Sequence, residues 1–366
     1  MRSVNTRLSE VPETFWKQLR TDLPRLVEEL APVVPNQIAH IKASAQPSCL
    51  SEILAFLRRD GAVIVENAVA PQVCDAVMQE LAPYLKVLED TQSGLRTKRL
   101  GGIFARSKAA WDLGAHPLVM DVAAGVLSNQ LLHEKGPPTS QMGGTQPFHA
   151  HGTQFIQIHP GETAQALHKD RTVIFDLFGG EHFEPQIGIA WALEDIGLSQ
   201  GPTRVVLGSH KWPADHPPPT EDMVSHAAMP KGSALFYASS TYHGGGANTT
   251  GKTPRGGNGE GRQRNVLFFS YNLAALTQEE NQYVACPADI AKDMPLKIQH
   301  LLGYTTFAGV WGFDPDFPEA LSAQKASDRY SGRQQPVNWG SDWQKRGPAT
   351  DWVAQGVPEY IPPSKL

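Results

Sequence analysis

From about residue 130 to 273 the chain is a series of short apolar or alternating runs separated by turn residues, and this pattern most constrains its fold. The runs are QLLHE, TQFIQIHPG, QALHKDRTVIF, PQIGIAWALEDI, TRVVLGSH, SALFYASSTYH and RNVLFFSYNL. Strands at such short spacing, with no helical pattern between them, indicate an antiparallel sandwich or barrel rather than a parallel sheet. We therefore predict an all-β core of the jelly-roll type.

Helical patterns flank this core on its N-terminal side. The segment from Ser51 predicts a helix, a turn at Gly61, a short strand and a second helix for which Pro71 suits the first turn. The glycine-rich segment TGKTPRGGNGEGRQR is expected to be a surface loop between two strands. We divide the chain into a helical N-terminal extension at 1–50, the core domain with its N-terminal helices at 51–290, and an irregular tail packed on the core at 291–366.

Charge and cysteine content limit the classes of partner. The chain has 32 basic and 37 acidic residues and a net charge of -5, which gives no electrostatic reason to expect nucleic acid or an anionic membrane. No run of eighteen apolar residues and no apolar secretory segment appear, so we expect an intracellular protein that does not span a membrane. Cys49, Cys74 and Cys286 form no CxxC pair, which argues against a disulfide framework or a zinc ribbon. These limits favour a small-molecule site.

The last three residues, Ser364, Lys365 and Leu366, spell the SKL address that the peroxisomal import receptor reads. In a eukaryotic cell this tripeptide predicts a peroxisomal location. In a bacterium, or as a chance sequence, it has no such meaning, and the expected location is then the cytoplasm.

The stretch QALHKDRTVIF places His168 and Asp170 two residues apart, ahead of a β-branched, apolar run. Side chains of a strand alternate between its two faces, so these two side chains are expected to point the same way. Such a pair supplies half of a metal site. A third ligand is offered by His243, which follows the SALFYASSTY run and precedes three glycines.

Two histidines and one carboxylate are typical of two kinds of metal site. Non-haem Fe(II) oxygenases use this set on one face of the metal and leave the other positions open. Catalytic zinc sites also accept it, with water as a further ligand. The ligand types alone do not decide between iron and zinc.

Several marks, in order along the chain, resemble the phytanoyl-CoA dioxygenase family of Fe(II)/2-oxoglutarate oxygenases, near its fungal branch that tailors natural products. The marks are the QxxHxD motif of residues 165–170, WALEDIGLSQGPTRVVLGSH, PKGSALFY, YHGGGAN and RNVLFF. The resemblance extends from about residue 56 to 273. It implies a double-stranded β-helix, which is a cupin-like jelly roll with flanking helices, and a homodimer as in many relatives.

The resemblance also implies roles for individual residues. His168, Asp170 and His243 are expected to bind Fe(II), and Arg264 to bind the far carboxylate of 2-oxoglutarate with two charge-assisted hydrogen bonds. Gln165 and Thr203 match positions that contact this cosubstrate in the fungal branch. The segment between His243 and Arg264 is longer than in the family pattern. Arg262 and Arg255, which also lie in this part of the sequence, are therefore alternatives to Arg264.

Other histidines and aromatics have simpler interpretations. His149 and His151 form an HxH pair without a nearby carboxylate, which favours lining of a pocket over metal binding. His182 and His210 are expected to be structural, and Arg204 to form an internal ion pair. A large aromatic such as Trp191 in a sandwich strand is more often a core residue than a stacking platform for substrate.

The segment GLRTKRLGGIFARSK, residues 94–108, carries five basic residues and no acid: Arg96, Lys98, Arg99, Arg106 and Lys108. We expect a solvated loop. The alternative is a lid that meets an anionic substrate such as a coenzyme A thioester.

The resemblance implies a dioxygenase that uses Fe(II), 2-oxoglutarate and O2 to oxidise a C–H bond of a hydrophobic small molecule, with release of succinate and CO2. The outcome could be hydroxylation, desaturation or rearrangement, and natural-product biosynthesis is the expected setting. Three alternatives stay open: a peroxisomal fatty acyl-CoA hydroxylase, a zinc-dependent hydrolase or lyase with the same ligands, and a non-catalytic binding protein. Residues of the substrate wall are expected at 101–111, 148–154 and 178–183.

Overall fold

The computed structural model describes residues 9, 11–34, 36–44, 47–132, 148–170, 183–213, 215–251 and 260–304. Among these residues, no helix has the length and apolar character needed to cross a membrane.

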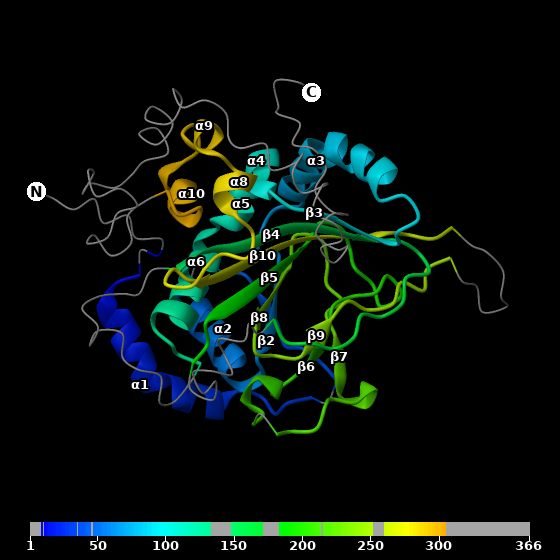
Figure 1. Cartoon of the computed structure of the whole chain (residues 1–366). Helices are drawn as coiled ribbons and strands as arrows, with labels where there is room; N and C mark the ends of the chain where they lie inside the picture. Colours follow the sequence, from blue (N-terminus) through cyan, green and yellow to red (C-terminus); the bar gives the residue numbers. More distant parts are fainter. Residues whose placement is uncertain are drawn as a thin grey trace, which may run out of the picture.

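A large mixed sheet forms the centre of the protein (Figure 1). Its strands are β1 (His40–Lys42), β2 (Ala62–Glu66), β3 (Thr97–Leu100), β4 (Phe148–Ile158), β5 (Gln186–Ala192), β8 (Ala234–Ala238) and β10 (Arg264–Leu273). The strand order is β1-β2-β8-β5-β10-β4-β3, in which β1 and β2 are parallel and the other neighbours are antiparallel. The predicted runs around 153–161, 185–196, 233–243 and 264–273 therefore contain strands, as expected.

A smaller antiparallel sheet lies opposite the large one (Figure 1). It has the order β7-β6-β9 and consists of β6 (Arg204–Val206), β7 (Val224–His226) and β9 (His243–Gly244). Apolar residues of both sheets, among them Val205 of β6, Leu235 of β8 and Val266 of β10, form one buried cluster between them. The two sheets thus enclose an interior layer.

Helices cover the other face of the large sheet (Figure 1). They are α1 (Glu13–Glu29), α2 (Pro47–Asp60), α3 (Pro71–Thr91), α4 (Ile103–Arg106), α5 (Ala109–Gly114), α6 (Pro117–Ala123), α8 (Gln282–Ala285), α9 (Ala288–Ala291) and α10 (Leu296–Leu301), with a π-helical turn at Ala124–Ser128. Pro71 is in the first turn of α3, as predicted. Gly61 has a φ of 78°, which confirms the turn between α2 and β2.

Residues of the central strands alternate between these two layers, as strand geometry requires. In β10, Leu267, Phe269 and Tyr271 pack against the helices, whereas Val266 and Phe268 face the small sheet. In β5 the large residues, including Trp191, face the helices, and the residues between them are Gly188, Ala190 and Ala192. The inner positions 188, 190 and 192 of β5 are therefore all small.

The structure corrects several expectations about local structure. Leu131 and Leu132 of the QLLHE run lie in a turn rather than a strand. The N-terminal extension is not only helical, because β1 joins the large sheet beside β2. The segment that follows 290 is not irregular as far as Tyr304, since α10 lies there. Residues 171–175 of the predicted HxD strand and 305–366 of the tail lie outside the described residues.

The basic segment 94–108 is not the solvated loop that we expected. It contains β3, which pairs with β4, and the short helix α4. Lys98 is buried and pairs with Glu89, and an Arg96 guanidinium nitrogen donates to the carbonyl of Gly161 at 2.5 Å. Strand pairing fixes the backbone here, and contacts with the body of the protein occupy these two cations.

We predict that Trp191→Ala lowers the free energy of unfolding. Trp191 is fully buried among residues that pack against the helices, and its ring lies edge-on to His116 at 5.7 Å. Truncation of a buried tryptophan costs about 3–5 kcal/mol of unfolding free energy, which a urea titration measures. Leu198→Ala is the control, because this side chain is 68% exposed and its removal should change the free energy by less than about 0.5 kcal/mol. A loss at Trp191 no larger than that of the control would contradict the assignment to the core.

Candidate metal centre

A backbone bridge brings together two histidines that are far apart in the sequence. The N–H of His168 donates to the carbonyl of His243 at 2.9 Å, and the N–H of His243 donates to the carbonyl of His168 at 2.8 Å. Residues that exchange both bonds in an antiparallel pair lie directly opposite each other, with side chains on the same face. The ring centroids of His168 and His243 are accordingly 4.6 Å apart.

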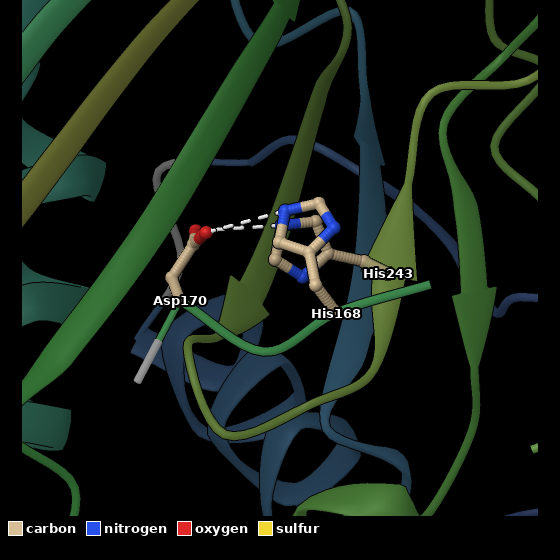
Figure 2. A group of neighbouring side chains, drawn as sticks. All are labelled: His168, Asp170 and His243. Atoms are coloured by element: carbon tan, nitrogen blue, oxygen red, sulfur yellow. Dashed lines mark ion pairs between the residues drawn. The ribbon is translucent and has the colours of Figure 1, made fainter. Parts of the chain in front are cut away.

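Asp170 completes the group from the same segment as His168. Its N–H donates to the carbonyl of Ser239 at 3.1 Å, which ties the segment to the residue that follows β8. Figure 2 shows the carboxylate directed at both rings, with Oδ1 at 3.6 Å from His168 Nε2 and Oδ2 at 3.4 Å from His243 Nε2. The described part of the segment forms a single bridge instead of a regular strand, yet the predicted convergence of the pair holds.

One potential ligand atom from each of these residues lies within 4.8 Å of the others. Within the described ranges of the chain, this is the one group of three or more histidine, cysteine or acidic residues with that geometry. Donors at such mutual distances match the spacing of ligands around a single transition-metal ion.

Hydrogen bonds determine which nitrogen of each imidazole can bind a metal. Nδ1 of His168 lies 3.0 Å from the carbonyl of Ala166, and Nδ1 of His243 lies 3.0 Å from the carbonyl of Thr241. A carbonyl oxygen only accepts, so each Nδ1 carries a proton, and Nε2 is the nitrogen left to bind a metal. Backbone carbonyls that orient ligand histidines in this way are a common feature of metal sites.

The carboxylate of Asp170 is in the form that a metal requires. Burial acts to raise the pKa of Asp170, but hydrogen bonds to His168 and His243 outweigh it and hold the pKa well below its usual range. The group is therefore ionised at neutral pH. Two imidazoles that bind through Nε2 and one ionised carboxylate fit a divalent iron ion, and they equally fit zinc.

Arg264, the first residue of β10, provides a buried guanidinium near the interior of the sheets. It is 3% exposed, and one of its terminal nitrogens donates to the carbonyl of Gly201. Its Nε is buried without a hydrogen-bond partner. Burial, with a smaller contribution from Arg99, lowers the pKa of Arg264 to about 10, so the group stays charged. A buried cation with unused donors is suited to an anionic ligand.

The rivals of Arg264 are less suited to this role. The side chain of Arg262 is exposed, and its backbone N–H donates to Thr250 Oγ1 at 2.9 Å. Arg255 lies outside the described residues. Arg264 also faces the interior, because it is on the same side of β10 as Val266 and Phe268.

Gln165 and Thr203 lie on the two segments that flank His243. The backbone N–H of Gln165 donates to the carbonyl of Gly245 at 2.9 Å, and its side-chain oxygen accepts from the N–H of Gly245 at 3.0 Å. Thr203 is half-buried and precedes β6, in which Val205 pairs with His243. Residues 203 and 205 share a face, so Thr203 points toward the interior.

Arg99 was expected in a loop and was not predicted to belong to the site. It lies on β3 opposite Ile156 of β4, which in turn is opposite Val266 of β10, so all three are on the inner face. Its guanidinium donates to Gln154 Oε1 at 2.5 Å. Burial lowers the pKa of Arg99, whereas the charge of Asp170 raises it. In the sequence, only the alternation within TKRL could have indicated this placement.

The other histidines that the structure describes do not join the group. His151 is buried and held by Glu279, whose N–H donates to Nδ1 at 3.2 Å and whose carboxylate lies 3.2 Å from Nε2. Burial lowers the pKa of His149 to about 4, so this residue is neutral. His210 is buried with Nε2 at 3.2 Å from the carbonyl of Arg58, which agrees with the structural role predicted for it. His182 lies outside the described residues.

The predicted internal ion pair of Arg204 is confirmed. Its Nη1 lies 2.7 Å from Glu221 Oε1, and a second terminal nitrogen donates to the backbone carbonyl of Gln165. Arg204 thereby links β6 to the segment that carries His168.

Known proteins share sequence with this chain. The sequence profile of the phytanoyl-CoA dioxygenase (PhyH) family matches residues 57–257. Dioxygenase swnH2 of Arthroderma benhamiae is 31% identical over 282 residues, which cover 72% of this chain and 83% of that protein. Dioxygenase olcK of Penicillium canescens is 25% identical over 292 residues, which cover 75% of this chain and 87% of that protein.

Among solved structures, the protein is similar to the non-heme alpha ketoglutarate dependent epimerase SnoN from nogalamycin biosynthesis. The TM-score is 0.43, with 16% sequence identity, and the match covers 63% of this chain and 82% of that one. Similarity at this level says nothing about reaction or substrate. The match of the family profile to more than half of the chain and the identity to swnH2 show that this protein belongs to the phytanoyl-CoA dioxygenase family.

Proposed function

We propose that the protein is an Fe(II)/2-oxoglutarate-dependent dioxygenase, on a double-stranded β-helix, that oxidises a C–H bond of a hydrophobic small molecule in natural-product biosynthesis. In this reaction 2-oxoglutarate is converted to succinate and CO2. The observation that carries this proposal is the convergence of His168, Asp170 and His243, with ligand atoms within 4.8 Å of one another. Membership of a dioxygenase family supports it.

The roles of the three ligands follow from their protonation. His168 and His243 bind Fe(II) through Nε2, because Nδ1 of each donates to a backbone carbonyl. Asp170 binds through an ionised carboxylate. These three residues would hold Fe(II), which would supply the activation of dioxygen that depends on 2-oxoglutarate.

The cosubstrate lies between the metal and Arg264. The buried guanidinium of Arg264 meets the far carboxylate of 2-oxoglutarate, for which its partnerless Nε and remaining N–H groups supply donors. Arg99 adds a second cation on the same inner face. Gln165 and Thr203, on the segments beside His243, complete the pocket.

The substrate occupies the inner layer beside the metal. The residues on that inner face are apolar, among them Val266 and Phe268 of β10 and Ala190 and Ala192 of β5. The natural-product setting rests on the resemblance of the chain to the fungal tailoring branch, and fungal dioxygenases are among its relatives. Of the expected wall segments, residues 178–182 lie outside the described part of the chain.

The fatty acyl-CoA alternative stays open. A coenzyme A thioester needs accessible cations, and although Lys98 is buried against Glu89, Arg96 and Lys108 of the basic segment are exposed. A zinc hydrolase or lyase could use the same three ligands. Neither it nor a binding protein accounts for the buried Arg264, which suits a dicarboxylate.

We predict that His243→Ala abolishes iron-dependent succinate formation, because two ligands hold the metal too weakly for turnover. The measurements are succinate production from 2-oxoglutarate and bound iron after gel filtration. His226→Ala, at the exposed end of β7, is the control and should retain both. Succinate formation by His243→Ala at the wild-type rate would contradict the proposed ligand set.

Arg264→Gln is expected to raise the KM for 2-oxoglutarate by about 10- to 100-fold, since hydrogen bonds to a charged group are worth about 1.5–3 kcal/mol. Substrate-independent succinate formation against 2-oxoglutarate concentration gives this value. Arg262→Gln, two residues earlier and exposed, should change KM by less than about twofold. The reverse result would transfer the role to Arg262.

A substrate screen separates the two oxygenase candidates. We expect uncharged hydrophobic compounds to raise the rate of succinate formation. Attachment of coenzyme A to an acyl substrate should not raise this rate further. Activity that disappears when the coenzyme A group is removed would instead favour the acyl-CoA hydroxylase. Replacement of iron by zinc provides the second comparison, because a zinc hydrolase or lyase would stay active without 2-oxoglutarate.

A further inference from the structure

Tyr237, in β8, contacts the candidate metal centre from the inner face of the large sheet. Its side chain is buried, and its hydroxyl lies 3.5 Å from Asp170 Oδ2. The sequence marks it only as one apolar position in SALFYA. Nothing in the roles assigned so far requires a hydroxyl group at this position.

Three neighbours fix the ring of Tyr237. It stacks on Phe268 of β10 at a centroid distance of 6.2 Å, and it lies tilted against the imidazole of His243 at 4.5 Å. Gly188 of β5 is directly opposite in the sheet, and a Cβ there would lie 2.4 Å from Tyr237 Cζ. The ring therefore leans over the backbone of β5, which is possible because residue 188 is glycine.

This orientation places the phenol where it can act on Asp170. A buried hydroxyl is costly without a hydrogen-bond partner, and phenylalanine would fill the same volume without that cost. In this contact Tyr237 donates and Asp170 accepts. The distance of 3.5 Å is at the long limit of a hydrogen bond, but the terminal torsion of a carboxylate is soft and a small rotation shortens it.

We propose that Tyr237 is a positioning residue that occupies one oxygen of Asp170 and thereby restricts this carboxylate to coordination of the metal through a single oxygen. The proposal rests on the proposed function. A six-coordinate ion with two histidines and one carboxylate oxygen has three further positions, of which a chelating keto acid takes two and dioxygen the last. A carboxylate that binds through both oxygens would remove the position for dioxygen.

The effect of the hydroxyl can be measured without turnover. The metal-free protein is loaded with Zn(II), and infrared difference spectra are recorded on samples with isotope-labelled aspartate. The separation between the antisymmetric and symmetric carboxylate stretches is larger for coordination through one oxygen than through two. We expect Tyr237→Phe to narrow this separation and to weaken Co(II) binding by about 10- to 100-fold, as is typical for loss of a partner that orients a ligand.

Tyr242→Phe is the matched control. It removes the same hydroxyl group five positions further along the chain, where the ring contacts Lys169 and Trp212 instead of Asp170. Its infrared separation and its Co(II) affinity should equal those of the wild type. Thermal unfolding of the metal-free proteins shows whether both variants are folded.

Gly188→Ala provides a second route to the same result and keeps the tyrosine. The added methyl group displaces the ring of Tyr237 and moves its hydroxyl from Asp170, so the infrared separation should narrow as in Tyr237→Phe. If Tyr237→Phe does not fold, this variant carries the test. A separation that stays at the wild-type value in the folded variant overturns the proposal, whatever happens to the affinity.

Failure of the proposed function gives a different result. A wild-type protein that binds no Zn(II) or Co(II), or that binds them equally well after His243→Ala, would refute the metal site itself and this proposal with it. A wild-type protein that binds both ions through His243, together with an unchanged infrared separation in Tyr237→Phe, would refute only the role of Tyr237.

Discussion

The antiparallel bridge between His168 and His243 is the constraint on which the site depends. Its two hydrogen bonds, at 2.9 and 2.8 Å, place the two imidazoles side by side although the residues are far apart in sequence. His243 has a second backbone neighbour, because Val205 of β6 pairs with it on the other side. His243 is thus held between the segment of His168 and strand β6. Asp170 lies on the same segment as His168. A ligand held by its backbone in this way needs little reorganisation when a metal binds.

Along the central strands, alternate side chains pack against the helices, and those between them face the small sheet and the site. One side of β5 carries the large residues that pack on the helices, and the other side carries Gly188, Ala190 and Ala192. β10 alternates in the same way, and its inner positions begin with Arg264 and continue to Phe268. Core residues and site residues therefore occupy alternate positions of the same strands. A shift of register by one residue would exchange the two sets, so the packing of the core also determines the geometry of the site.

Sequence patterns were sufficient for the parts of the protein that depend on local chemistry. The strands β4, β5, β8 and β10 follow from apolar alternation, and the turn at Gly61 from its dipeptide. The convergence of His168, Asp170 and His243 was expected from a motif and from resemblance, and the binding of iron by them stays a prediction. The patterns failed where pairing partners decide structure: Leu131 and Leu132 lie in a turn, and β1 and β3 form only because a neighbouring strand is available. Import through Ser364, Lys365 and Leu366 also stays a prediction, since these residues lie outside the described ranges.

Arg99 and Tyr237 show why a site of this kind cannot be completed from sequence alone. Each belongs to a strand whose sequence pattern does not indicate contact with a ligand, and Arg99 is also far from every ligand in the sequence. Their relation to Asp170 appears through the sheet: β3 pairs with β4, β4 with β10, β10 with β5 and β5 with β8, and the inner residues of each strand lie beside one another. A cation on the edge strand and a phenol four strands away then both interact with the same carboxylate, the cation through its charge and the phenol through a hydrogen bond. The register of the whole sheet therefore determines where the groups that contact or charge-pair with Asp170 lie. The positions of the three ligands themselves depend only on two short segments.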